Sequence, residues 1–452
     1  MTALRLAAIA LLTVSSSDAR ADVVLDWNRV ARDVIRANTS LQDPGNASRS
    51  MAMMNLAIYD AVAMTDPSGT MYYDYGLGNA SPGYALSHKA AASQAAFEVL
   101  SSLYPDQQST IDAALTSSLG GVTAGTAKTE GVALGTMVGR SIITRRQNDG
   151  FDTSSQYVPT LGVPGRWTPD PLNPTQEAWG PEWGGVRTFS ITSGSQFTAP
   201  PMPALDSAEY AAAYNEVKDY GAVNSPSRTA VQEEIGVFWA YDREGMGTPH
   251  HLFNEILEVI SLQEGNTLQE NASLFATASV AMADAGVAAW HSKFDYDFWR
   301  PVTGIRDGDL DGNPLTIGDP NWAPLGAPGG SGTDFTPPFP TYVSGHATFG
   351  GALFRVLETF YGTDDIAFTL ESDELPGVTR SFDSFSDAMA ENGRSRVYLG
   401  IHWNFDDTVG QALGAEIADY IMSGPFIAAV PEPSTLGAAL LAMLAGVRRR
   451  HG

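Results

Sequence analysis

The chain has 452 residues, no cysteine and a formal net charge of −25 at pH 7. A chain this acidic is repelled by nucleic acid and by anionic membrane surfaces, so we exclude both as binding partners. Without cysteine there are no disulfides and no thiol chemistry, and the fold must be stabilised by a hydrophobic core, for which the chain is long enough.

The first 21 residues predict a secretory signal peptide. Arg5 precedes an apolar run at residues 6–14, and the Ala-Arg-Ala sequence at 19–21 is typical of a cleavage site. We therefore leave residues 1–21 out of the fold prediction and expect the protein to be exported.

Apolar residues recur at helical spacing along most of the remaining chain, and convincing alternating strands are absent. We predict an all-α fold of two helical bundles in one globular unit, with an N-terminal helical region at 22–205 and a C-terminal one at 206–424. Residues 149–204 are rich in Pro, Gly, Ser, Thr and Trp and predict a long irregular loop that walls a site entrance. The expected helices span 26–38, 51–64, 84–104, 111–119, 126–146, 207–220, 228–241, 252–261, 268–290, 347–357 and 407–422.

Two cations follow the longest of these helices. Lys293 and Arg300 stand seven residues apart, a spacing of two helical turns, so we expect both side chains on one helical face. Pro301 is predicted to mark the end of that helix, because the residue before a proline disfavours helical geometry.

A second segment predicts an anion site at the start of a helix. Prolines at 337, 338 and 340 lead into Ser344, Gly345 and His346, and a run of small residues at helical spacing follows. This order places the Ser344 hydroxyl and the Gly345 N–H at a helix N-terminus, where backbone donors and the helix dipole favour an anion.

A third segment joins a cation, an imidazole and a carboxylate. Arg396 and His402 are six residues apart, and Gly400 between them supplies a break that lets both converge on one point. Asp406 lies one helical turn beyond His402 and is placed to accept its second ring N–H. Since guanidinium forks match tetrahedral oxyanions in pairs, the three segments together predict an oxyanion pocket in the C-terminal bundle.

The three segments read Lys-x6-Arg-Pro at 293–301, Val-Ser-Gly-His at 343–346 and Ser-Arg-x5-His-x3-Asp at 395–406. In this order they resemble the motifs of the vanadium-dependent haloperoxidase and type 2 phosphatidic acid phosphatase superfamily. The first and third motifs are complete, and the second carries Val343 where proline is usual.

The resemblance implies vanadate as the cofactor, with His402 as the only protein ligand to the metal. It also implies that His346 acts as acid–base catalyst and that Lys293 polarises the bound peroxide, so that His346, His402 and Lys293 form the catalytic set. A halide would be oxidised by hydrogen peroxide to hypohalous acid, which reacts with a small organic acceptor. The residues implied to bind the oxygens of vanadate are Lys293, Arg300, Ser344, Gly345 and Arg396.

Four further residues are expected around this set. Asp242 is expected, by analogy with the haloperoxidases, to accept from one of the arginines, and Asp406 to fix the tautomer of His402. Trp290 is expected to stack beside the pocket. Phe339 stands where chloroperoxidases of the family carry phenylalanine and many bromoperoxidases histidine, which favours use of chloride. The adjacent His250 and His251 are interpreted as surface or capping residues.

The same residues allow two alternatives. In an acid phosphatase of the superfamily, His402 would attack phosphorus to form a phosphohistidine, and phosphate also competes with vanadate for the donors. We favour the haloperoxidase because the chain is long and has no 18-residue apolar run in its core. A non-catalytic surface protein is the third possibility, and the complete residue set argues against it.

The C-terminal residues 430–452 predict a sorting segment. Val-Pro-Glu-Pro-Ser at 430–434 precedes an apolar run at 436–447 and three arginines at 448–450. The run is shorter than the roughly 20 residues of a membrane span. It resembles the PEP-CTERM tail of Gram-negative bacteria, which implies transient membrane contact and a final location at the cell surface or in the extracellular matrix.

Overall fold

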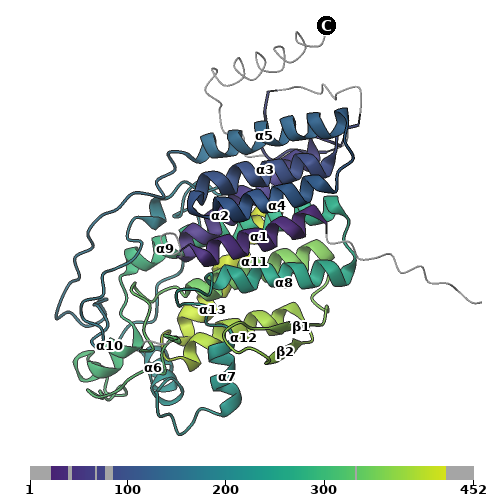
Figure 1. The fold of residues 1–452 in the computed structure, drawn as a ribbon. Coiled ribbons are helices and arrows are strands. Elements are labelled where there is room, and N and C mark those ends of the chain that lie inside the picture. Colours follow the sequence, from purple (N-terminus) through teal and green to yellow (C-terminus); the bar gives the residue numbers. More distant parts are fainter. Residues whose placement is uncertain (1–21, 39–42, 67–68, 77–84, 331–332, 424–452) are drawn as a thin grey trace, which may run out of the picture.

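The computed structural model describes residues 22–38, 43–66, 69–76, 85–330 and 333–423 (Figure 1). The predicted signal peptide and the predicted sorting segment lie outside these residues. Thirteen α-helices and one two-stranded sheet make up the described part, which confirms the all-α fold. The boundary predicted between residues 205 and 206 stays a prediction.

The N-terminal helices lie side by side, with α5 on the outside (Figure 1). The central helix of this group is α2, which is buried around most of its circumference and packs on both α3 and α9. Its apolar surface therefore joins the two parts of the molecule in one core. The elements are α1 (Val23–Ala37), α2 (Pro44–Ala63), α3 (His88–Leu103), η1 (Pro105–Gln107), α4 (Gln108–Gly120) and α5 (Thr126–Arg146).

The C-terminal helices hold the predicted pocket residues. Helix α11 packs closely on α13, and a Cβ at Gly414 would lie 2.0 Å from the Thr348 carbonyl oxygen, so only glycine permits this approach. The contact brings the start of α11 beside the start of α13. The elements are η2 (Trp183–Gly185), α6 (Ala208–Tyr220), α7 (Ala230–Phe238), α8 (Pro249–Glu264), α9 (Leu268–Tyr296), α10 (Pro301–Arg306), η3 (Gly308–Leu310), α11 (Gly345–Tyr361), α12 (Phe385–Tyr398) and α13 (Asn404–Ser423).

Helix α9 is the long central helix on which α2, α11 and α13 pack. It begins at a capping box in which Thr267 and Glu270 bond to each other's backbone N–H groups. Among the described helices, α9 alone is long and apolar enough to cross a membrane, but 94% of its apolar window is buried by other parts of the protein. That burial is the environment of a core helix.

The prediction that Lys293 and Arg300 share one helical face is wrong. Helix α9 ends at Tyr296, because Asp297 takes a left-handed conformation with φ of 53°. Arg300 is the N-cap of α10, and Pro301 begins that helix instead of ending α9. Proline suits the first helical position, where its missing N–H has no helical acceptor.

Strands β1 (Phe368–Glu371) and β2 (Thr379–Phe382) and helices α10 and α12 were absent from the predicted set. The two strands form an antiparallel hairpin, but four residues are too few for a clear alternation. Helix α12 is rich in polar residues, so it has no strong apolar stripe. It packs through small residues, and a Cβ at Gly393 would overlap the Asp407 carboxyl of α13.

Residues 149–204 are irregular apart from η2, as predicted. Asp284 of α9 anchors this loop, since its carboxyl accepts the backbone N–H groups of Phe189, Ser190 and Ile191 at 2.6–2.9 Å. A buried carboxylate with three such donors is well satisfied, so the loop is tied to the core helix.

Candidate oxyanion-binding site

A cavity of about 210 Å³ lies where α2, α11 and the loop 149–204 meet. Its lining includes Arg396, His346 and His402, together with several aromatic and proline side chains. The predicted residues Asp242, Trp290, Phe339 and Gly345 also line it. Lys293, Arg300, Ser344 and Asp406 lie behind this lining. Lys293 lies over the Phe339 ring, Arg300 and Asp406 are bonded to His402, and Ser344 directly precedes Gly345.

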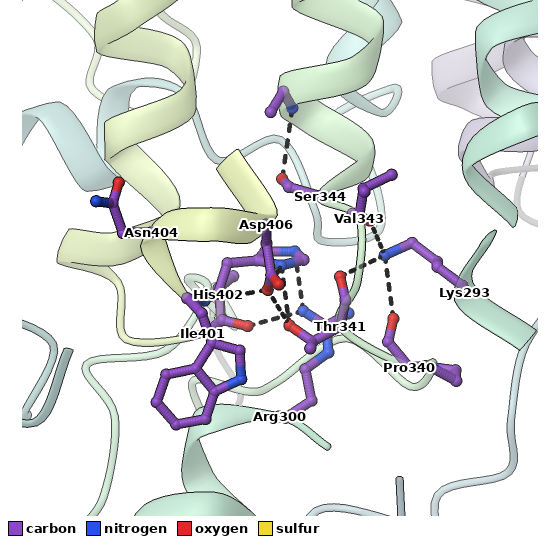
Figure 2. A network of polar contacts seen from close by, with 12 residues as sticks. Lys293, Arg300, Pro340, Thr341, Val343, Ser344, Ile401, His402, Asn404 and Asp406 are labelled. Atoms are coloured by element: carbon purple, nitrogen blue, oxygen red, sulfur yellow. Dashed lines mark hydrogen bonds and ion pairs between the residues drawn. The ribbon is translucent and has the colours of Figure 1, made fainter. Parts of the chain in front are cut away.

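His402 presents one unprotonated ring nitrogen to the site. Its Nε2 lies 2.9 Å from Nη1 of Arg300, which can only donate, so Nε2 is the acceptor and carries no proton. The ring proton is therefore on Nδ1, which donates to Oδ2 of Asp406 at 2.9 Å (Figure 2). Burial is the main cause that lowers the pKa of His402, and the nearby charge of Arg300 is the second. The imidazole is therefore neutral at pH 7.

Asp406 is held by more donors than the sequence revealed. The Thr341 hydroxyl donates to Oδ2 of Asp406 and lies 3.1 Å from Nδ1 of His402, while the Trp403 N–H donates at 3.0 Å. Burial raises the pKa of Asp406 to about 7, and the Thr341 hydrogen bond opposes that rise. Thr341 was missed because a threonine between a proline and a tyrosine has no spacing signal.

We expect Thr341→Val to weaken anion binding about tenfold. This is the lower end of the loss in affinity that is usual when a residue orienting a metal-binding histidine is replaced. The reason is that valine keeps the shape but leaves Asp406 and the His402 ring less firmly oriented. Calorimetric titration with orthovanadate measures the effect. Thr277→Val is the matched control, since the Thr277 hydroxyl is partly buried in α9 and bonds only to the Ser273 carbonyl. Equal affinity in both variants would contradict the role of Thr341.

Arg300 connects two of the motifs. Its Nε donates to the Phe339 carbonyl and its Nη1 to the Ile401 carbonyl, both at 2.8 Å. Its Nη2 is buried and has no partner among the described residues. Burial lowers the pKa of Arg300 to about 9, and the group stays charged at neutral pH.

Lys293 is bound by the chain that leads to the second motif. Its Nζ donates to the carbonyls of Pro340 and Thr341 at 3.0 Å and of Val343 at 2.6 Å (Figure 2). Burial lowers the pKa of Lys293 well below its usual range, yet three acceptors need three N–H donors, which only the ammonium form has. Lys293 therefore adds charge behind the cavity while its donors are engaged.

The second motif forms the N-terminus of α11, as predicted. Ser344 is the N-cap, and its hydroxyl accepts from the Ala347 N–H at 3.4 Å. The Ser344 N–H donates to the Asp406 carbonyl at 3.0 Å, which fixes the second motif to the third. As the first helical residue, Gly345 has an N–H that no helical carbonyl accepts, and it lines the cavity.

Arg396 supplies two further free donors. It lies in the last turn of α12, and its Nη2 forms an ion pair with Asp242, which lies between α7 and α8. Its Nε and Nη1 are buried without a partner among the described residues. Together with Nη2 of Arg300, these atoms are unpaired cationic donors near the unprotonated Nε2 of His402. This donor set fits a tetrahedral oxyanion such as vanadate.

His346 has the opposite tautomer. Its Nε2 donates to the Ala240 carbonyl at 2.8 Å, so in the neutral ring Nδ1 holds the lone pair. Burial, and after it the charge of Arg396, lowers the pKa of His346 to about 4. The ring is therefore a neutral base at pH 7. The Ala240 carbonyl that fixes it could not be found by sequence motif, because every residue has one.

Aromatic residues form the other side of the cavity. The ring of Trp290 lies 5.0 Å from that of Phe339 and 5.1 Å from that of Trp179, which comes from the loop 149–204. The Phe339 ring also lies 5.0 Å from Nζ of Lys293. The predicted loop thus contributes Trp179 to the wall of the cavity.

The interpretation of His250 and His251 as surface or capping residues is wrong. Both are buried in the first turns of α8. The ring of His250 packs edge-on against Phe349 at 4.4 Å, and that of His251 stacks on Tyr241 at 5.9 Å. Adjacent residues on a helix can both be buried where different neighbours cover the two sides, which sequence spacing does not reveal.

Comparison with known proteins shows which enzymes the chain is similar to. Residues 273–424, which contain all three motifs, match the family model described as the VCPO second helical-bundle domain. The vanadium chloroperoxidase of Curvularia inaequalis is 31% identical over 492 residues, an alignment that covers 85% of this chain and 78% of that protein.

Solved structures share the fold over nearly the whole chain. A bacterial vanadium-dependent iodoperoxidase superposes with a TM-score of 0.72 at 25% identity, covering 90% of this chain and 97% of that one. The holo form of a bacterial vanadium-dependent chloroperoxidase gives a TM-score of 0.64 at 16% identity, covering 85% and 93%. At that identity the second likeness concerns the fold alone.

Proposed function

Because this chain belongs to the vanadium haloperoxidase family, we propose that it oxidises a halide with hydrogen peroxide, using vanadate held in the cavity. The observation that carries this proposal is the unprotonated Nε2 of His402, bonded to Arg300 and next to unpaired guanidinium donors. Bound vanadate would supply a Lewis acid that activates peroxide towards a halide ion.

The residues of this chain would hold the anion in two ways. His402 offers the single nitrogen ligand, with Asp406 fixing its proton on Nδ1. Arg300 and Arg396 bring positive charge and donors to the oxygens, and the Gly345 N–H adds a backbone donor. We assign the Ser344 hydroxyl to the same set and treat Lys293 as a source of charge, because its donors are engaged by carbonyls.

His346 is the proposed acid–base catalyst. A neutral imidazole with its lone pair on Nδ1 can accept a proton from hydrogen peroxide and return it to a leaving oxygen. Its pKa of about 4 keeps it in this basic form at neutral pH. Below that value the ring is protonated and can no longer act as a base.

Use of chloride and bromide is the finer part of the proposal. It is supported by Phe339, whose ring lies in the aromatic wall beside the cations of the site. Relatives named as a chloroperoxidase and an iodoperoxidase share this fold, so the fold alone does not select the halide. Parallel assays with chloride, bromide and iodide test it.

A phosphatase is the alternative, because the same donors suit phosphate and the unprotonated Nε2 of His402 is also a nucleophile. The discriminating experiment purifies the protein without phosphate, adds orthovanadate, and compares halogenation of monochlorodimedone with hydrolysis of p-nitrophenyl phosphate. We expect halogenation that depends on vanadate. Hydrolysis without halogenation would overturn the proposal.

We expect Arg396→Lys to weaken vanadate binding measurably, and Arg396→Ala to weaken it further. Lysine keeps the charge but lacks the planar fork that meets two oxygens at once. A vanadate titration of phosphate-free protein measures the affinities, and rising phosphate should displace vanadate. Arg394→Lys is the control on the same helix, because Arg394 pairs with Glu216 away from the cavity. Unchanged binding in Arg396→Ala would contradict the proposed pocket.

We also propose export followed by transient membrane contact, which rests on the sequences of residues 1–21 and 430–452. Fractionation of cells that express the full chain tests this. We expect the protein at the cell surface or in the matrix, with both segments absent from the mature form by mass spectrometry. An intact chain that stays in the cytoplasm would contradict it.

A further inference from the structure

A carboxyl group at the N-terminus of α2 faces the cavity and has no assigned task in halide oxidation. Asp43 lines the cavity and is the N-cap of α2. Its two oxygens accept from the backbone N–H and the side-chain amide of Asn46, each at 2.7 Å. The group is only partly buried, so a molecule in the cavity can reach it.

The carboxyl of Asp43 caps α2 but has no cationic side chain beside it among the described residues. Asp242, the other acidic residue of the lining, is paired with Arg396. No cation of the described residues pairs with Asp43. Burial raises its pKa to about 6, and only hydrogen bonds from Asn46 and Gly45 lower it. No arginine contributes to this shift, whereas Arg396 of the oxyanion site is paired with Asp242.

Asp43 shares the cavity lining with the aromatic rings of Trp179 and Trp290. The chain after Asp43 runs against Trp183, since a Cβ at Gly45 would lie 2.3 Å from that ring. The Trp183 ring is 5.8 Å from that of Trp179, and the Trp179 ring in turn contacts that of Trp290 in the cavity wall. Carboxylate and aromatic faces together are the surroundings that favour an organic cation.

We propose that the cavity binds small aromatic acceptors that carry an organic cation, with the cation at Asp43 and the aromatic ring towards His402. The inference rests on the proposed function and names the class of its organic substrate. The positive charge of Arg396 disfavours the reverse orientation. Three features therefore act together: the carboxylate without a cationic partner, the Trp179 wall and the cationic end of the cavity.

The reaction of such an acceptor is an aromatic halogenation. Bromide, hydrogen peroxide and one proton give hypobromous acid and water, so bromide loses two electrons and peroxide gains them. The acceptor then exchanges one ring hydrogen for bromine, and a second water molecule is released. The organic cation takes no part in these bond changes and serves only for binding.

Two probes of nearly the same shape isolate the effect of charge. One is the phenol whose para substituent is 2-(trimethylammonio)ethyl, and the other is 4-(3,3-dimethylbutyl)phenol, in which carbon replaces the nitrogen. Neither has an amine that hypobromite can attack. Both are offered together to the vanadate-loaded enzyme with bromide and peroxide, and the ratio of brominated products is compared with that from reagent hypobromite.

We expect the enzyme to favour the cationic probe by about tenfold relative to reagent hypobromite. Asp43→Asn should return the ratio to the reagent value, because asparagine caps a helix as well as aspartate but has no charge. Asp43→Ser, with another capping residue, is a second uncharged variant. Asp22→Asn is the matched control and should keep the wild-type ratio, since Asp22 caps α1 outside the cavity.

The competition ratio does not depend on how fast each variant oxidises bromide. An enzyme ratio equal to the reagent ratio would overturn the inference. The proposed function is checked separately, by formation of triiodide from iodide and peroxide without any organic acceptor, and would stand if triiodide forms. A preference that persists in Asp43→Asn and Asp43→Ser would overturn the assignment of Asp43. Absence of halide oxidation in the loaded wild-type protein would instead overturn the proposed function.

Discussion

His402→Ala is expected to abolish vanadate retention, the largest effect of any single substitution in the site. The variant loses the only nitrogen ligand, while Arg300 and Arg396 offer hydrogen bonds and charge alone. Asp406 keeps its bonds from Thr341 and the Trp403 N–H, so the fold should survive with a lowered Tm. Vanadium per chain after gel filtration, measured by mass spectrometry, gives the result.

The matched control for His402 is His250→Ala, which also removes a buried imidazole. His250 packs on Phe349 and does not line the cavity, so this variant should lose stability but retain vanadium. Equal vanadium content in His402→Ala and the parent protein would show that His402 is not the ligand.

His346→Ala is expected to bind vanadate with little loss but to turn over about 10²–10⁴-fold more slowly, the usual contribution of general acid–base catalysis. Its Nδ1 holds the free lone pair, since Nε2 is bound to the Ala240 carbonyl. Comparing kcat with the dissociation constant for vanadate separates the two effects. If affinity fell as steeply as kcat, His346 would be a binding contact and not the proton carrier.

Sequence spacing predicted those features of the site that depend on residues close together in the chain. Asp406 follows His402 by one helical turn, and the structure places the two groups 2.9 Å apart. The order Ser-Gly-His predicted a helix N-terminus, and α11 begins at Gly345. Both features depend on neighbours within four residues, which is the range that sequence spacing can describe.

Contacts between distant segments were beyond that range. Thr341 joins His402 to Asp406, and the Ala240 carbonyl fixes His346 from more than 100 residues away. Asp43 reaches the cavity only because α2 packs along α9. None of these has a motif of its own, since each acts through tertiary packing.

The ends of elements were also set by local backbone conformation. A helix could continue from Lys293 to Arg300 on spacing alone, but the left-handed Asp297 ends it and redirects the chain. The change still leaves both cations behind one cavity. The structure thus brings Lys293 and Arg300 together, but along a path of the chain that differs from the predicted one.

The central claim is that halide oxidation takes place at one oxyanion site around His402. The most direct measurement titrates orthovanadate into phosphate-free protein and follows bound vanadium and bromide oxidation in the same samples. We expect activity to rise in proportion to bound vanadium, to level off at one vanadium per chain, and to vanish in both readouts for His402→Ala. Bromide oxidation that is independent of bound vanadium, or full vanadium binding without any oxidation, would contradict the account.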